Sequence, residues 1–197
     1  MATDISVKQT QAVVAGYVSS VPARVWLRRD GVWGPKTEAA VIRFQHYHSL
    51  TEDGIVGPLT TAALFGVLDP DWSTTHFNWN EFWSRGTFKG GLTPDVQRNV
   101  LLTMFKLEAI RKIGGGRALH VNSAFRTPRH NADVGGAANS QHQYGIAVDI
   151  TMDGLTPNQL AANCKMAGMS GVNAYNNWVH TDSRDEFDYG SRGYWWP

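Results

Sequence analysis

Apolar residues recur at helical spacing in the second half of the chain. Residues 93–112 place them on one side of an expected helix, at Val96, Val100, Leu101, Met104, Leu107, Ala109 and Ile110. Thr93 stands before Pro94 and is expected to cap the helix N-terminus. The glycine run at 114–116 then ends the helix. A shorter helix is expected at residues 157–166.

Strand patterns occur in the same part of the chain. Residues 118–125 and 145–152 alternate apolar and polar positions, as half-buried strands do, and residues 178–183 predict a short last strand. Helices and strands are thus both expected here, which predicts an α+β fold. The aromatic tail at 189–197 is expected to pack onto the body of this domain.

A sequence repeat lies in the first third of the chain. The run Asp-Gly-Val-Trp-Gly-Pro at 30–35 matches Asp-Gly-Ile-Val-Gly-Pro at 53–58, and Ala-Ala follows each copy. Asp-Gly predicts a tight turn, and Gly-Pro opens a helix with proline at its first position. Between the copies, apolar residues continue at helical spacing. We therefore expect a small helical bundle in residues 1–68.

Residues 69–90 are expected to link this bundle to a second domain, residues 91–197. Asp69-Pro70-Asp71 breaks regular structure. An aromatic cluster follows, made of Trp72, Phe77, Trp79, Phe82, Trp83 and Phe88. Because aromatic side chains bury large areas, we expect the cluster to seal an interface between the domains rather than to stack on sugar rings.

The charge balance excludes some classes of function. Lysine and arginine total 18 against 17 acidic residues, for a net charge of +1. Nucleic-acid-binding domains usually carry a strongly basic face, so no nucleic-acid partner is expected. No window approaches the roughly 20 apolar residues of a membrane span, so no membrane insertion is expected. The single cysteine, Cys164, excludes an intramolecular disulfide.

Three residues form a candidate metal-binding set. His142 and Asp149 are seven positions apart, and His180 lies in the expected last strand. Two imidazoles and one carboxylate are a common set for catalytic zinc, because three protein ligands leave the fourth tetrahedral position open for water. The ion acidifies that water and polarises a carbonyl group. The pattern therefore predicts one zinc ion per chain.

The surrounding residues resemble a known family. The motif Ser-x-His-x-x-Gly-x-Ala-x-Asp is filled by Ser140, His142, Gly145, Ala147 and Asp149, and Phe125-Arg126 stands upstream. This pattern is similar to that of the zinc D-Ala-D-Ala peptidases of bacterial cell walls, a group that includes lysostaphin-type endopeptidases and the hedgehog domain. The resemblance implies a central antiparallel sheet. The repeat in residues 1–68 likewise resembles the three-helix peptidoglycan-binding domain of wall hydrolases.

The resemblance also implies roles around the metal. Arg126 matches a family arginine that grips the substrate, and its planar guanidinium suits a carboxylate or a carbonyl oxygen. Ser140 matches a serine that positions either the substrate or the adjacent ligand loop. Tyr175 falls where some relatives carry another polar group and is a candidate to hydrogen-bond the developing oxyanion, as is Arg126.

The general base is the unusual feature of this sequence. In family members an acidic residue lies three positions before the second histidine, and here that place holds Asn177. An amide cannot accept a proton from water at neutral pH. Asp182 shares a strand face with His180, since residues two apart point the same way. Asp182 is therefore a candidate for the base, or for a carboxylate that orients His180.

Together these features predict a zinc-dependent peptidoglycan hydrolase that cuts a D-alanine-containing bond, as an endopeptidase or a carboxypeptidase. Two alternatives stand beside it: a non-catalytic wall-binding protein that keeps zinc, suggested by Asn177, and a structural component of a phage particle. We expect a monomer whose partner is peptidoglycan. Residues 1–6 lack the pattern of a secretory signal. We therefore expect synthesis in the cytoplasm, followed by release or delivery to the wall through phage lysis or injection.

Overall fold

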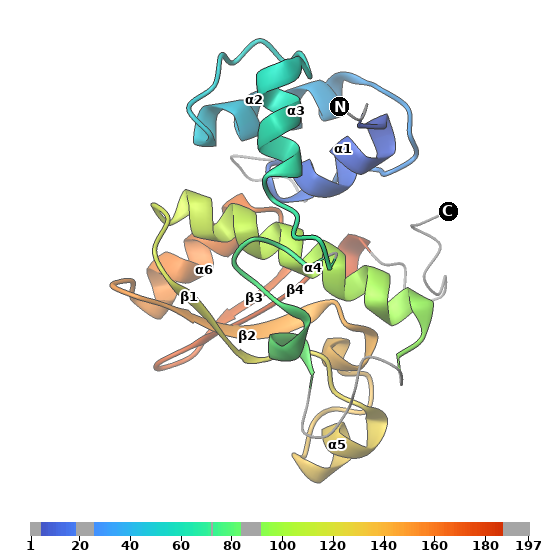
Figure 1. The fold of residues 1–197 in the computed structure, drawn as a ribbon. Helices are drawn as coiled ribbons and strands as arrows, with labels where there is room; N and C mark the ends of the chain where they lie inside the picture. Colours follow the sequence, from blue (N-terminus) through green and yellow to red (C-terminus); the bar gives the residue numbers. More distant parts are fainter. Residues whose placement is uncertain (1–4, 19–25, 72, 84–91, 187–197) are drawn as a thin grey trace.

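The computed structural model describes residues 5–18, 26–71, 73–83 and 92–186. Its N-terminal bundle consists of α1 (Val7–Val13), η1 (Val14–Gly16), α2 (Pro35–Tyr47) and α3 (Pro58–Phe65). Both α2 and α3 begin with proline directly after a glycine, as the repeat predicts. Figure 1 shows these helices grouped on one side of the long helix α4 (Pro94–Ile113).

Beyond the bundle, the described residues form helices and one sheet. After η2 (Trp79–Phe82) and α4 the chain forms β1 (Leu119–Ser123), α5 (Pro128–Asp133), η4 (Gln141–Tyr144), β2 (Ala147–Met152), α6 (Pro157–Met166), β3 (Gly171–Ala174), β4 (Val179–Asp182) and η5 (Arg184–Glu186). The Thr93 side chain accepts a hydrogen bond from the Val96 N–H and caps α4 as predicted. This arrangement confirms the α+β fold. Strand β3 and helix α5 were not predicted from the pattern.

The four strands form an antiparallel sheet in the order β1-β2-β4-β3. Val148, Ile150 and Val179 point to one face and are fully buried in the main core. Helix α6 contacts β2, β3 and β4, and α4 packs on α6. The alternate residues of β2 and β4 face the opposite side, because successive side chains of a strand point to opposite faces.

The N-terminal bundle packs closely on α4. A Cβ atom at Gly16 would lie 2.5 Å from the Ala109 Cβ, so a larger residue would separate the two surfaces. A buried ionic cluster lies beside this contact: Glu186 accepts hydrogen bonds from Arg29 Nη1 at 2.9 Å and from Lys106 Nζ at 2.5 Å. Burial lowers the pKa of Lys106, although Glu186 opposes that shift. The cluster joins the loop before α2 to the end of the described chain.

The aromatic residues after the linker are mostly interior. Phe77 and Phe82 are each 1% exposed, and Trp79 stacks on Trp83. The Phe82 carbonyl accepts a hydrogen bond from the Phe125 N–H, which ties this segment to the chain beyond β1. Such burial leaves no aromatic face of Phe77 or Phe82 for sugar stacking. The expected cluster members Trp72 and Phe88, and the aromatic tail, lie outside the described residues.

Candidate metal centre

His142 is presented by a tight turn before β2. It lies in η4, and Gly145 ends that turn with φ 73°, a left-handed conformation that favours glycine. A Cβ at Gly145 would also lie 2.9 Å from Val100 Cγ2 and 3.1 Å from the Val96 carbonyl oxygen. Glycine therefore allows the turn to approach α4 closely, and the chain then enters β2 with Asp149 two residues into the strand.

The register of the sheet brings the second histidine to this position. Asp149 of β2 pairs directly with His180 of β4, and directly opposed residues lie on the same face with their Cβ atoms about 5 Å apart. Val179 and Thr181, the neighbours of His180, are fully buried on the other face. The burial of these neighbours thus fixes the side of the sheet on which His180 lies.

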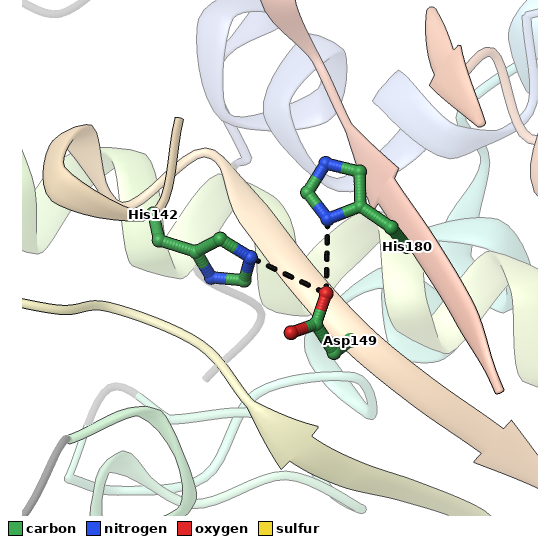
Figure 2. A group of neighbouring side chains, drawn as sticks. All are labelled: His142, Asp149 and His180. Atoms are coloured by element: carbon green, nitrogen blue, oxygen red, sulfur yellow. Dashed lines mark hydrogen bonds and ion pairs between the residues drawn. The ribbon is translucent and has the colours of Figure 1, made fainter. Parts of the chain in front are cut away.

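The three side chains converge on one point. Asp149 Oδ1 lies 2.9 Å from His180 Nδ1 and 3.3 Å from His142 Nε2 (Figure 2). One ligand atom from each residue lies within 4.8 Å of the others. His142 is 3% exposed and Asp149 is 7% exposed. Two imidazole nitrogens and a carboxylate oxygen at this spacing are a donor set that fits zinc.

Each imidazole is oriented by a partner on its other nitrogen. His142 Nδ1 donates to the Ala124 carbonyl at 2.6 Å, which leaves Nε2 to face Asp149. His180 Nε2 lies 3.0 Å from Asp182 Oδ2. A carboxylate can only accept here, so Nε2 carries the proton and Nδ1 faces the centre. Partners of this kind fix the tautomer and the ring orientation of metal-binding histidines.

The electrostatics favour a cation between these groups. Burial raises the pKa of Asp149, but hydrogen bonds from His142 and His180 outweigh it and hold that pKa below its usual range. Burial lowers the pKa of His180, but the carboxylates on its two ring nitrogens raise it to about 9. His180 therefore holds a proton where a metal ion would bind, and the two compete for Nδ1.

Arg126 lies at the edge of the centre. Its Nη2 donates to Asp149 Oδ2 at 2.8 Å and its Nε donates to Ser123 Oγ at 3.0 Å. Its backbone N–H donates to the His142 carbonyl. The two oxygens of Asp149 are thus divided, with one facing the histidines and the other facing Arg126.

Asp182 lies on the far side of His180 from Asp149. The Asp182 side chain is fully buried, and it accepts hydrogen bonds from the Arg184 backbone N–H, Nε and Nη2 as well as from His180. Ala147 and Gly171 flank it in the register. A Cβ at Gly171 would overlap both carboxylate oxygens. This geometry supports the orienting role for Asp182 rather than the role of base.

The other predicted site residues are more peripheral. Tyr175 is 46% exposed and its ring stacks on Trp178 in the turn between β3 and β4. Ser140 precedes η4, and its side chain makes no capping hydrogen bond. Asn177 is exposed in the same turn as Tyr175. Among the described residues, the group that could hold a metal ion consists of His142, Asp149 and His180 and includes none of these three.

Some supporting residues carried no signal in the sequence. Arg184 and Gly171 matter only because the strand register places them around Asp182. Ala124 contributes a backbone carbonyl, which any residue type could supply. In the sequence, the segment that contains Ala124 was marked only by the family element Phe125-Arg126 that follows it.

Comparison with known families agrees with this geometry. A family model described as Peptidase M15 matches residues 75–182, and one described as a peptidoglycan binding domain matches residues 7–64. The chain belongs to the Peptidase M15 family. The family that the motif indicated is thereby confirmed.

Two relatives are similar over different lengths. The zinc D-Ala-D-Ala carboxypeptidase of Streptomyces albus G is 38% identical over 151 residues, which cover 74% of this chain and 57% of the relative. An uncharacterized protein in the bpoA1 3' region of Kitasatospora aureofaciens is 63% identical over 35 residues, covering 18% of this chain and 30% of that protein. The chain thus spans little more than half of the first relative. Among the described residues, no helix is both long and apolar enough to cross a membrane.

Proposed function

We propose that this chain is a zinc-dependent peptidoglycan hydrolase that cuts a D-alanine-containing peptide bond of the wall. The observation that carries the proposal is the convergence of His142, Asp149 and His180 within the segment that matches Peptidase M15. The name of the Streptomyces albus G relative supports both the metal and the bond type. In this proposal residues 1–68 bind the wall and residues 91–197 carry the catalytic site. Residues 69–90 link these two domains.

In the proposed enzyme His142 Nε2, Asp149 Oδ1 and His180 Nδ1 would hold the zinc ion. When bound, the ion supplies an acidified water and polarises the carbonyl of the bond to be cut. The protein contributes orientation: the Ala124 carbonyl and Asp182 hold the two imidazole rings through their outer nitrogens.

Arg126 is the proposed substrate-gripping residue. Two of its guanidinium nitrogens are held by Asp149 and Ser123, which fixes the plane of the group. Its Nη1 donates no hydrogen bond to another described residue, and its side chain is 18% exposed. A fixed guanidinium with a free N–H edge suits a substrate carboxylate or carbonyl oxygen. The substrate of a carboxypeptidase would offer Arg126 a terminal carboxylate, whereas the substrate of an endopeptidase would offer it a peptide carbonyl oxygen.

A second function is favoured by one observation. The position three residues before His180 holds Asn177, and the oxygens of Asp182 are already engaged by Arg184 and His180. Asp182 is therefore not free to accept the proton in place of Asn177, and among the described residues Asp149, itself a proposed metal ligand, is the carboxylate grouped with the two histidines. A non-catalytic wall-binding protein that keeps zinc for structure is the alternative proposal.

Digestion of purified peptidoglycan tests both proposals. The full chain is loaded with zinc, incubated with peptidoglycan, and the soluble products are analysed by mass spectrometry, with a chelator and with His142→Ala as controls. A hydrolase releases products that gain one water at a D-alanine bond, and both controls abolish the release. Free D-alanine would indicate a carboxypeptidase, and separated stem peptides would indicate an endopeptidase. A zinc-loaded chain that binds peptidoglycan but releases nothing supports the alternative. We further propose that the protein reaches the wall by release or delivery.

A further inference from the structure

The two copies of the sequence repeat fold into loops that are pinned by the same set of hydrogen bonds. In the first copy, Gln11 Nε2 donates to Asp30 Oδ1 at 3.2 Å, to the Val32 carbonyl at 3.0 Å and to Thr37 Oγ1 at 3.2 Å. Gln11 Oε1 accepts from the Gly31 N–H at 2.9 Å. One buried side chain therefore ties the turn to the start of α2.

The second copy repeats this arrangement atom for atom. Gln45 Nε2 donates to Asp53 Oδ1 at 2.8 Å, to the Ile55 carbonyl at 3.0 Å and to Thr60 Oγ1 at 3.1 Å, and Gln45 Oε1 accepts from the Gly54 N–H at 2.9 Å. Gln11 lies 19 residues before its aspartate, whereas Gln45 lies 8 residues before its own. The two glutamines are outside the aligned repeat, so their equivalence exists only in the fold.

Each pinned loop holds an aliphatic side chain in solvent at the equivalent position. Val32 is 66% exposed and Ile55 is 64% exposed. Trp33, the next residue in the first loop, is 41% exposed, and Leu59, in the first turn of α3 directly after the second loop, is 76% exposed. Grouped apolar residues on a surface mark a binding site more often than isolated ones do. Because the buried glutamines already fix both loops, little ordering entropy would be lost when a ligand binds.

The two loops lie at the same end of α2. The first loop runs directly into the N-terminus of α2 at Pro35. The second packs against the first turns of that helix, since a Cβ at Gly54 would lie 2.9 Å from Glu38 Cγ and 3.3 Å from Ile42 Cγ1. Figure 1 shows α3 starting at this end and running toward α4. The surface is therefore on the side of the bundle away from the sheet.

We propose that Val32, Ile55 and the neighbouring Trp33 and Leu59 form one docking surface for the stem peptides of peptidoglycan, with Val32 and Ile55 each contacting an alanine methyl group. This inference rests on the proposed wall-binding function. Aliphatic side chains complement methyl groups, whereas sugar rings are usually held by aromatic faces. The aromatic Trp33 is not repeated, because its counterpart in the second loop is Val56.

A twofold-repeated surface suits a polymer whose stem peptides also repeat. Contacts at two linked points bind more tightly than either contact alone, because the second contact forms within the same complex. A single substitution should therefore weaken binding, and substitution of both loops should weaken it further.

Sedimentation with insoluble peptidoglycan tests the surface in the full chain. Val32→Ser and Ile55→Ser should each raise the apparent Kd about tenfold, the loss expected for one buried aliphatic contact. The double variant should raise it about a hundredfold. Val134→Ser is the matched control, since Val134 is an aliphatic residue that is 52% exposed in the peptidase segment. Thermal unfolding checks that every variant is folded.

The possible outcomes separate this inference from the wall-binding proposal. If the parent chain does not sediment with peptidoglycan, both proposals fail. If the parent sediments and the double variant binds equally well, wall binding stands and the loop surface is wrong. Competition, with a chelator present, identifies the ligand: a soluble stem pentapeptide ending in D-Ala-D-Ala should displace the parent chain. Displacement by N-acetylglucosamine oligomers alone would overturn the assignment to stem peptides.

Discussion

The role of Asp182 can be decided by one isosteric substitution, Asp182→Asn. The carboxylate is fully buried and receives N–H groups from Arg184 and His180. An asparagine of the same shape keeps one acceptor oxygen but presents an NH₂ group in place of the other. The His180 ring then loses a charged acceptor, and its Nδ1 is no longer held toward Asp149.

The two possible roles of Asp182 predict different effects of the substitution. An orienting carboxylate affects zinc affinity, whereas a general base affects turnover. Removal of a partner that orients a metal-binding histidine typically weakens metal affinity about 10–100-fold. Removal of a general base leaves affinity unchanged and lowers turnover by roughly 10²–10⁴-fold. The structure supports the first outcome, because Asp182 lies on the side of His180 that faces away from the metal centre.

Zinc titration against a chromophoric chelator measures the affinity directly, and it needs no catalytic activity. We expect Asp182→Asn to bind zinc about 10–100-fold more weakly, with any loss of turnover restored by excess zinc. Gly171→Ala provides a steric test of the same contact, because its Cβ would lie 2.5 Å from the Asp182 Cγ. It should weaken zinc binding in the same direction. Unchanged zinc affinity in Asp182→Asn, together with lost turnover at saturating zinc, would refute the orienting role.

Three further predictions concern the metal ligands, Asn177 and His48. His142→Ala and His180→Ala should each lose stoichiometric zinc, as measured by metal analysis of folded protein; full zinc content in both would exclude the proposed ligand set. Asn177→Asp should raise peptidoglycan hydrolysis if the missing carboxylate limits the parent, and equal rates at equal zinc content would show that it does not. Burial lowers the pKa of His48 to about 4, below its usual value of 6.5, so the unfolded chain binds the extra proton. The stability that the neutral His48 contributes should therefore be fully present above about pH 6.5 and be lost as the pH falls toward 4. In urea unfolding, His48→Gln should lose less unfolding free energy between pH 7 and 5 than the parent chain does. An identical loss in the two proteins would exclude His48 as the cause.

Much of the local structure was determined by the sequence alone. The starts of α2, α3, α4 and α6 follow from proline at the first helical position, because proline lacks the N–H that a first turn leaves unpaired. The spacing of His142, Gly145 and Asp149 also sets local geometry, since the turn at Gly145 feeds directly into β2. These features depend on neighbouring residues, so the pattern of the chain was sufficient to predict them.

Strand β3 shows where the sequence was insufficient. Its residues include Gly171 and Asn173, which are depleted in strands and gave no strand pattern. Gly171 is placed there by a tertiary requirement, because the carboxylate of Asp182 occupies the space that a side chain would fill. The pairing of Gly171 with Asp182 depends on strand register, and register is fixed by burial of the opposite face of the sheet.

The chemistry of the centre divides in the same way. The sequence determined which residue types could bind a metal, because His142, Asp149 and His180 are donors wherever they lie. Only the tertiary structure decided which nitrogen of His180 faces Asp149 and which faces Asp182, and that choice separates a positioning carboxylate from a base. It also decided that Gln11 and Gln45, at unequal distances from their loops, make equivalent bonds. Contacts between residues far apart in the chain depend on how the helices and strands pack, and the local sequence pattern does not determine that packing.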